Sequence, residues 1–300
     1  MQSNADLALD SKSDCGPDLV LFDDDLHLFW RHLDDGSIKW ARLVDKENWE
    51  WVGGSTGQTT SHRPAVVEYN GALMVAWKDA DSSDLHWGML DAEYNLSKTT
   101  FVKAKSKSGP TLAAFDGGVI LAHIGKTGGI AGNSLYNMTF DGSSWSADTK
   151  VSGHSTKEAP AMAMMGGVLR MVHRGEWPGV AGNTIYFSSY EETSGEYAWS
   201  TSEDTDQKSQ DGLALVGEES GVISNSLVMA HNGSVSKDIF AGSYSEEEGW
   251  TENRYESWST DARPALCISD DAIYIAWKEA NGNTLKVELW TLARATPGCT

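Results

Sequence analysis

A segment of about 50 residues recurs six times along this chain, and this repetition restricts the fold more than any other feature of the sequence. Each copy begins near a proline or glycine and continues into three short apolar segments. The copies start, in order, at Pro17, Pro64, Pro110, Pro160, Gly212 and Pro264. Successive starts lie 47, 46, 50, 52 and 52 residues apart, so six copies fill the 300 residues. The sequence therefore predicts one repeat domain over residues 1–300.

The second copy, Arg63–Asp91, shows what one repeat contains. A strand AVVEY turns at Asn70-Gly71 into a second strand, ALMVAW, and a polar loop leads to a third strand, LHWGML. Short apolar runs punctuated by Gly, Asn and Asp are typical of antiparallel strands. A weaker fourth segment follows, and in most copies we expect it to open with tryptophan, as in WEWVGG, WSADTKV, WSTSEDT and WTENRYES. Four antiparallel strands per repeat predict an all-β fold, a six-bladed β-propeller of four-stranded blades.

The two ends of the chain are expected to meet in the last blade. The sixth copy ends after its third strand, LKVELW, whereas the N-terminal LALDSKSDCGP is similar to FVKAKSKSGP at the end of the second copy. We therefore expect residues near Leu7–Asp10 to supply the missing outer strand and close the ring. A disulfide between Cys15 and Cys299 is a hypothesis, while Cys267 lies in an apolar strand and is expected to be a buried thiol.

The charge of the chain argues against several partners. A formal net charge of -20 repels phosphate backbones and anionic headgroups, so we expect no nucleic-acid partner and no membrane insertion. Three cysteines without metal-ligand spacing predict no metal site, and no motif predicts a cofactor. No signal peptide is visible, which leaves the cytoplasm, or secretion as a mature form, open for a soluble protein. The oligomeric state stays open.

One face of the ring is the expected ligand site, because the first strand of a propeller blade starts there and the second strand ends there. The second strands end on a ring, at Trp30, Trp77, His123, His173, His231 and Trp277. Basic residues follow four of these rings and begin two of the first strands, namely Arg31, Lys78, Arg174, Lys278, Arg63 and Arg263. We expect these rings to stack on a ligand while the basic groups donate hydrogen bonds. The alternative is that a ring repeated in every copy packs between blades, since every blade meets the same packing problem.

Two long loops follow the second strands of the third and fourth copies, GKTGGIAGNS and GEWPGVAGNT. They are expected to project over the same face and to bring Trp177 to the ligand. No Gly-x-Ser-x-Gly, His-Glu-x-x-His or Cys-x-x-Cys motif occurs, so spacing assigns no catalytic residue.

The repeat (Ser/Gly)-x-Pro-Ala, followed by an apolar strand ending in Trp-Lys and later by Trp-Ser, resembles that of fungal and bacterial β-propeller lectins and sialidase-like propeller proteins. The resemblance covers all six copies and implies a carbohydrate-binding fold. Such lectins often bind a sugar between blades through an aromatic residue, an Arg and a Glu, and this triad does not map onto successive copies here. The Ser-x-Asp-x-Gly-x-x-Trp turns of sialidases are absent from the sequence.

Two functions follow from these patterns. The first is a lectin-like, carbohydrate-binding propeller without catalytic activity, whose partner is a glycan or another small-molecule ligand. The alternative is an enzyme of the cyclase, isomerase or hydrolase type, with one site in the central channel that uses Trp, His and Arg at its mouth. It is motivated by His123, His173 and His231, which stand in consecutive copies and suit proton transfer or oxyanion stabilisation. A protein-interaction scaffold is a third possibility.

Overall fold

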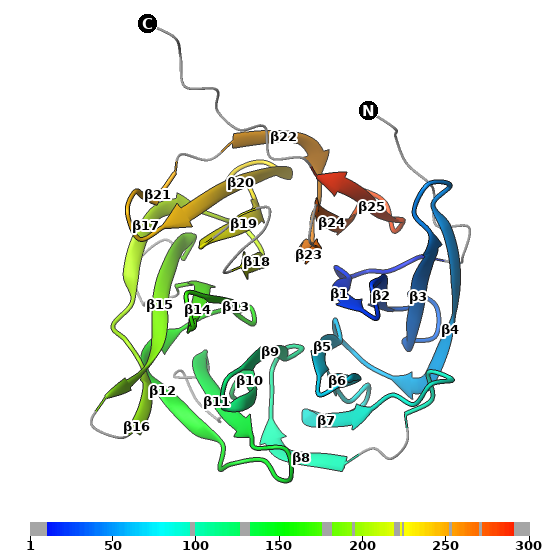
Figure 1. The fold of residues 1–300 in the computed structure, drawn as a ribbon, viewed down its shortest axis with the longest axis horizontal. Helices are drawn as coiled ribbons and strands as arrows, with labels where there is room; N and C mark the ends of the chain where they lie inside the picture. The colour runs from blue at the N-terminus through cyan, green and yellow to red at the C-terminus, as the bar shows by residue number, and fades with distance from the viewer. Residues whose placement is uncertain are drawn as a thin grey trace, which may run out of the picture.

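Six β-sheets stand around a central channel (Figure 1). The structure is a computed structural model, and it describes residues 11–96, 100–126, 133–175, 182–193, 196–218, 223, 225–251, 254–269 and 272–290. All regular elements in these residues are β-strands, so none of them includes a helix that could span a membrane. The prediction of an all-β, six-bladed propeller is confirmed.

The first three blades are four-stranded antiparallel meanders. Blade 1 contains β1 (Asp18–Phe22), β2 (Asp25–Arg31), β3 (Ser37–Asp45) and β4 (Glu50–Thr59). Blade 2 contains β5 (Ala65–Tyr69), β6 (Ala72–Lys78), β7 (Asp84–Met89) and β8 (Thr100–Lys105). Blade 3 contains β9 (Thr111–Phe115), β10 (Gly118–Ile124), β11 (Ser134–Phe140) and β12 (Thr149–Ser155).

The last three blades vary this plan. Blade 4 contains β13 (Ala161–Met165), β14 (Val168–Arg174), β15 (Thr184–Thr193), β16 (Glu196–Trp199) and β17 (Glu203–Lys208). Blade 5 contains β18 (Leu213–Glu218), β19 (Ser226–Asn232), β20 (Asp238–Ser245), β21 (Gly249–Trp250) and β22 (Arg254–Ser259). In both, the third strand pairs with a short strand and then with the outer strand. Blade 6 contains β23 (Ala265–Ser269), β24 (Ala272–Lys278) and β25 (Leu285–Trp290).

The tryptophans that were expected to open the outer strands lie before those strands instead. Trp199 and Trp250 end the short strands β16 and β21, and Trp145 precedes β12. Two of these rings pack on a tyrosine of their own third strand, with centroids 5.0 Å apart for Tyr190 and Trp199 and 5.3 Å apart for Tyr244 and Trp250. The repeated tryptophan therefore marks a ring that covers the third strand, and the outer strand follows it.

The hydrophobic core is divided among the interfaces between neighbouring blades. The second strand of each blade supplies much of it, and every residue of β10 is buried. Successive side chains of a strand point to opposite faces, so one strand serves two interfaces. In β2, for example, Trp30 packs with residues of blade 6, whereas Phe29 packs with residues of blade 2.

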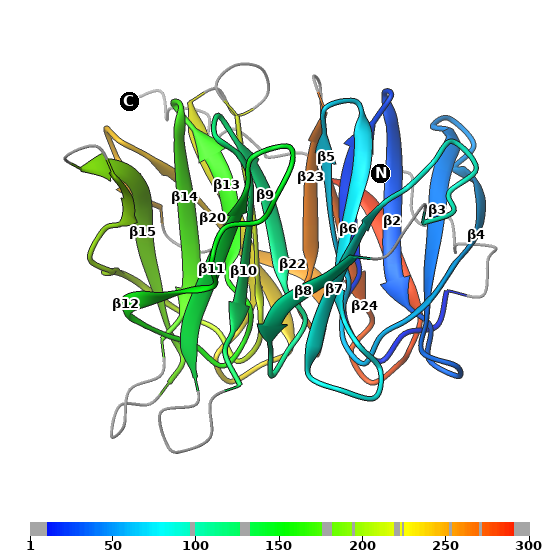
Figure 2. The same ribbon diagram turned by 90° about the horizontal axis from the view of Figure 1, so that it is seen from below.

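The inner strands run along the channel, as the side view shows (Figure 2). Each contacts the inner strand of the next blade, and β23 contacts β1, so the six blades form a closed ring. Next to β25, the backbone N–H of Ser13 donates to the carbonyl of Asn283 at 2.7 Å, and Lys12 forms a bridge with Thr284. Leu7–Asp10 lie outside the described residues, and closure of blade 6 by that segment stays a prediction.

Candidate functional site

The six linkers that lead into the inner strands form one mouth of the channel, and a buried hydroxyl positions each of them. The linkers begin at Ser13, Thr60, Ser106, Thr156, Ser209 and Thr260, all 0% exposed. Each of these residues donates its backbone N–H to a carbonyl close to the start of a third strand. In five of them the hydroxyl also donates to the carbonyl two residues on, at 2.7 to 3.1 Å. These bonds fix the turns whose remaining residues surround the mouth.

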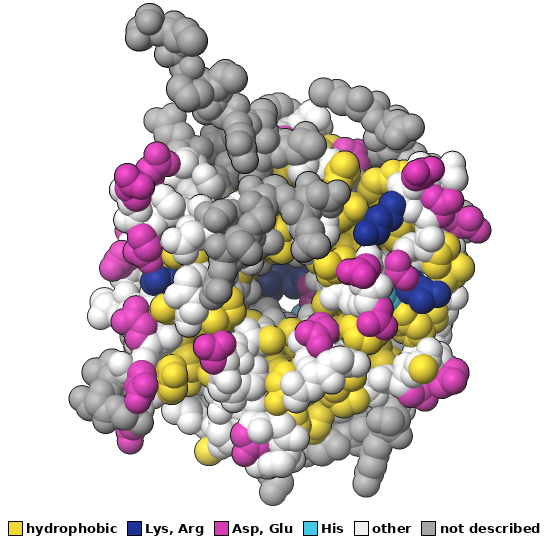
Figure 3. Space-filling view, in the orientation of Figure 1, with side chains coloured by type: hydrophobic (Ala, Val, Ile, Leu, Met, Phe, Trp, Pro, Cys, Tyr) yellow, Lys and Arg dark blue, Asp and Glu magenta, His cyan; other side chains and the backbone are white. Residues whose placement is uncertain are grey.

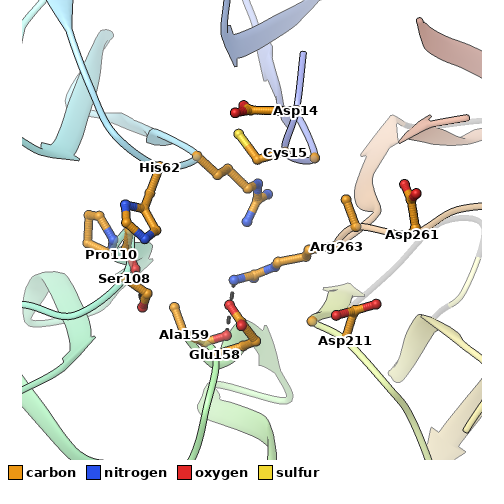
Figure 4. Close-up of a pocket in the computed structure, with 15 residues that line it drawn as sticks. Asp14, Cys15, His62, Ser108, Pro110, Glu158, Ala159, Asp211, Asp261 and Arg263 are labelled. Carbon is orange, nitrogen blue, oxygen red and sulfur yellow. Dashed lines mark hydrogen bonds between the residues drawn. The ribbon is translucent and has the colours of Figure 1, made fainter. Parts of the chain in front are cut away.

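A pocket of about 210 Å³ lies within this mouth and is lined by all six linkers (Figure 4). The third residue of each linker contributes a different group to it, in the order Cys15, His62, Ser108, Glu158, Asp211 and Ala262. The residue at this position therefore differs from blade to blade, and His62, Ser108, Glu158 and Asp211 bring polar groups into an otherwise largely apolar lining. This describes one asymmetric site for each chain rather than six equivalent sites.

The fourth linker residue is small in four blades and arginine in two. Glycine is required beside the arginines, because a Cβ on Gly16 would lie 1.8 Å from the carbonyl oxygen of Arg263. A Cβ on Gly109 would likewise lie 2.3 Å from the carbonyl oxygen of Arg63. Seen from the face in Figure 3, basic side chains lie inside the central opening of this acidic molecule. These two glycines thus let their linkers approach the backbones of the linkers that carry Arg263 and Arg63.

Blade 1 holds Arg63 in place. Its Nε donates to the carbonyl of Pro17 at 2.5 Å, and its Nη2 forms an ion pair with Asp18. The other carboxylate oxygen of Asp18 accepts the backbone N–H of Val66 at 2.8 Å. Because this network spans blades 1 and 2, Arg63 has a structural partner before any ligand arrives.

Arg263 is less well satisfied than Arg63. Its Nη1 donates to the carbonyl of Ala159 at 3.2 Å, and its Nε has no hydrogen-bond partner (Figure 4). In the part of the chain that the structure describes, Arg263 forms no ion pair. Burial lowers the pKa of Arg263 well below its ordinary value; the charge of Arg63 lowers it further, and Asp18 and Glu158 oppose the shift. A buried polar group without partners is costly, so Arg263 would gain most from an acceptor oxygen on a ligand.

Carboxylates from blades 4 and 5 face the arginines across the pocket. Glu158 is accessible to water but lies in the concave mouth, where loss of bulk hydration raises its pKa. Asp211 raises this pKa further, while Arg174 and Arg263 lower it. Guanidinium groups only donate hydrogen bonds, and ionised carboxylates only accept them. The pocket can therefore pair with a ligand that carries several hydroxyl groups.

The six rings at the ends of the second strands do not line this pocket. All six are at most 4% exposed, and the tryptophans belong to clusters between adjacent blades. Trp77 stacks on His86 with centroids 5.7 Å apart, and His123 stacks on Tyr136 at 5.8 Å and contacts Asp148 through Nε2 at 3.0 Å. These placements correspond to the packing role that the sequence left open, so Trp30, Trp77, His123, His173, His231 and Trp277 are not part of the candidate site.

The basic residues that follow the rings contact linkers rather than the pocket. Arg31 pairs with Asp14 at 2.7 Å, and Lys278 pairs with Asp261 at 2.5 Å. Arg174 donates to the carbonyl of Gln210. Lys78 lines a separate pocket between blades 2 and 3. Trp177 lies outside the described residues.

His173 predicts a pH dependence of stability. Burial, together with the smaller effect of the neighbouring His154, lowers the pKa of this ring to about 3. Below about pH 6.5 the unfolded chain binds a proton on this ring, and the folded chain does not. The contribution of the neutral ring to the unfolding free energy is therefore complete above pH 6.5 and is lost as the pH falls toward 3. Between pH 7 and pH 5 the ring should cost about 2 kcal/mol of unfolding free energy. Denaturant titrations at pH 7 and pH 5 measure this loss. The unfolding free energy of His173→Phe should fall by about 2 kcal/mol less than that of wild type, and an equal fall in both would contradict the assignment.

The carboxylates Glu158 and Asp211 and the thiol of Cys15, at the third linker position, were not among the predicted site residues. The sequence does contain a signal for them. The pattern (Ser/Thr)-x-x-x-Pro recurs in five of the six linkers, and the residue midway between the Ser or Thr and the Pro varies from copy to copy. Cys15 lies in the mouth and forms no disulfide with another described residue, while Cys299 lies outside the described residues, so the Cys15–Cys299 disulfide stays a prediction. Cys267 is buried as expected. The described residues contain no cluster of His, Cys, Asp and Glu that could hold a metal ion.

No protein-family model and no curated protein matches the sequence. Solved structures do match. An α-L-arabinanase from Penicillium chrysogenum complexed with arabinobiose aligns with a TM-score of 0.69 at 13% identity, over 95% of this chain and 94% of that one. The fucose-specific lectin from Aleuria aurantia aligns with a TM-score of 0.69 at 13% identity, over 95% and 94%. The Hadza microbial sialidase Hz136 aligns with a TM-score of 0.70 at 14% identity, over 94% of this chain and 67% of that one. The chain therefore shares its six-bladed fold with propeller lectins and with sialidase- and arabinanase-like propellers.

Proposed function

We propose that the protein is a lectin-like propeller that binds a carbohydrate in the mouth pocket without transforming it. The observation that carries the proposal is Arg263, a largely desolvated guanidinium whose Nε faces no acceptor among the described residues. A sugar hydroxyl or ring oxygen in the pocket would supply that acceptor and repay part of the cost of burying the charge.

The composition of the pocket supports a polyhydroxylated ligand. Donors from Arg263 stand opposite acceptors from Glu158 and Asp211, and each sugar hydroxyl both donates and accepts. Pro110 and Ala159 add apolar surface to the same pocket. Solved propellers of the same fold include a fucose-specific lectin and an arabinanase with bound arabinobiose, and both ligands are sugars.

Binding without catalysis is favoured because the described pocket residues do not form an activated nucleophile. Burial raises the pKa of the Cys15 thiol to about 11, so it stays protonated at neutral pH and is a poor nucleophile. The Ser108 hydroxyl donates to the carbonyl of Gly109 at 3.2 Å, and among the described residues it forms no hydrogen bond with a His, Asp or Glu side chain that could activate it.

A second candidate is glycoside hydrolysis, and one observation favours it. The raised pKa of Glu158 beside Asp211 is what a general acid paired with an ionised carboxylate requires. In that case Glu158 would protonate the leaving oxygen. This is the channel enzyme considered from the sequence, with carboxylates in place of the histidines.

A glycan array followed by a hydrolysis assay separates these candidates. Selective binding of one sugar that remains intact after prolonged incubation would support the lectin. Release of free sugar by wild type, lost in Glu158→Gln while binding persists, would instead establish the hydrolase. An array without any selective binding would contradict both.

A further inference from the structure

A second pocket, beside the mouth and between blades 2 and 3, collects positive charge. It has a volume of about 320 Å³. Its polar lining consists of Lys78, Lys107, Lys126, Asp81, Ser82, Ser83 and Ser106. Three ammonium groups thus share the pocket with one carboxylate, in a chain whose formal net charge is -20.

Blades 1 and 6 show one way in which a basic residue at the end of the second strand is neutralised here, whereas Arg174 of blade 4 donates to the carbonyl of Gln210. Arg31 ends β2 and pairs with Asp14 at 2.7 Å. Lys278 ends β24 and pairs with Asp261 at 2.5 Å. In both blades the carboxylate is the second residue of the preceding linker, so the pair lies within one blade.

Blade 2 keeps the cation and lacks this carboxylate. The corresponding linker residue is Ser61, whose hydroxyl accepts a hydrogen bond from Lys78 Nζ at 2.7 Å. Lys78 is only 8% exposed, and its other acceptor is the carbonyl of Asp79 at 3.5 Å. The Asp79 carboxylate instead accepts the backbone N–H groups of Asp81 and Ser82 at 2.9 and 2.8 Å. A buried ammonium group therefore has only neutral oxygen acceptors.

The other two lysines have neutral partners as well. Lys126 Nζ donates to Ser83 Oγ at 2.6 Å, and Lys107 Nζ donates to Asn133 Oδ1 at 3.0 Å. Across the described residues none of the three lysines forms an ion pair. Burial lowers the pKa of Lys78, the positive charge of Lys126 lowers it further, and the nearby Asp79 carboxylate opposes the shift. Like charges that line one pocket favour an anion between them.

We propose that this pocket is an oxyanion-binding site that takes a sulfate, phosphate or carboxylate group. Lys78 and Lys126 supply the charge, and the Ser83 hydroxyl, which accepts from Lys126, retains its own proton to donate. The pocket adjoins the mouth, because Lys107 lines the one and Ser108 lines the other. The anion is therefore either a free ion or an acidic substituent of a larger ligand, and the site does not depend on the carbohydrate proposal.

Replacing Ser61 tests the proposal, because blades 1 and 6 supply the design. Ser61→Asp restores the carboxylate found at Asp14 and Asp261 and should pair with Lys78. In a calorimetric titration at low ionic strength, wild type should bind sulfate at one site. A titration with sodium chloride of equal ionic strength is the reference. Ser61→Asp should bind sulfate at least about tenfold more weakly while melting no lower than wild type. Ser61→Ala, which adds no charge, is the matched control and should bind within about threefold of wild type.

Equal sulfate affinity in wild type and Ser61→Asp would overturn the proposal, as would the absence of sulfate and phosphate binding to wild type. A comparison of sulfate, galactose and galactose 6-sulfate identifies the source of the anion. Tighter binding of the sulfated sugar than of either component would assign the site to an acidic substituent. If galactose 6-sulfate binds with the same affinity as sulfate, the site takes a free ion.

Discussion

A Gly16→Ala variant is expected to lose about 3 kcal/mol of unfolding free energy, the upper end of typical overpacking costs. The added Cβ would lie 1.8 Å from the carbonyl oxygen of Arg263, and the obstacle is backbone, which cannot move aside as a flexible side chain can. Relief requires blades 1 and 6 to separate where the ring closes. Arg263 would move with its backbone, so ligand binding in the mouth should fall together with stability.

Ala159→Gly is the matched control for this variant, because Ala159 occupies the same linker position in blade 4. It removes a methyl group and should change the unfolding free energy by less than about 1 kcal/mol. Guanidinium denaturation of the two variants measures the difference. A wild-type midpoint for Gly16→Ala would mean that the linkers do not approach each other as closely as described.

A Trp77→Ala variant should lose about 4 kcal/mol of unfolding free energy, as is usual when a buried large ring is removed. Trp77 is 2% exposed, packs between blades 1 and 2 with Phe29 and Val66, and stacks on His86. Its ring does not line the mouth pocket, so the folded variant should bind ligand at the mouth with wild-type affinity.

Trp77→Phe should lose less than half as much stability, because a smaller cavity is left. Thermal melts and glycan titrations well below the melting temperature test both statements. A small loss of stability combined with a large loss of affinity would show that the ring contacts the ligand, as the sequence first suggested.

The architecture was predictable because repetition is visible in one sequence. Six copies at nearly constant spacing, each with short apolar runs, leave few folds other than a propeller. The outer strands were harder to place, because Trp199 and Trp250 look like strand beginnings but cover the third strand.

The candidate site could be predicted only in part. Arg63 and Arg263 stood out because they occupy a position that is small in the other copies, and the structure places both in the mouth pocket. The rings do not line this pocket, because a strand between two neighbouring blades is buried on both faces, and a single sequence does not show which side chains of that strand reach the channel. Glu158 and Asp211 were hidden among 43 acidic residues, and only the folded linkers bring them together.

The most direct measurement of the central claim is a calorimetric titration with the glycan selected on the array, using wild type, Arg263→Gln and Lys105→Gln. Lys105 ends the outer strand β8 with a side chain that is 64% exposed, so it serves as a surface control. We expect one site per chain in wild type, unchanged affinity in Lys105→Gln, and at least about tenfold weaker binding in Arg263→Gln. Several equivalent sites per chain, with an affinity unaffected by Arg263→Gln, would contradict the account and would place the sugar at the blade junctions.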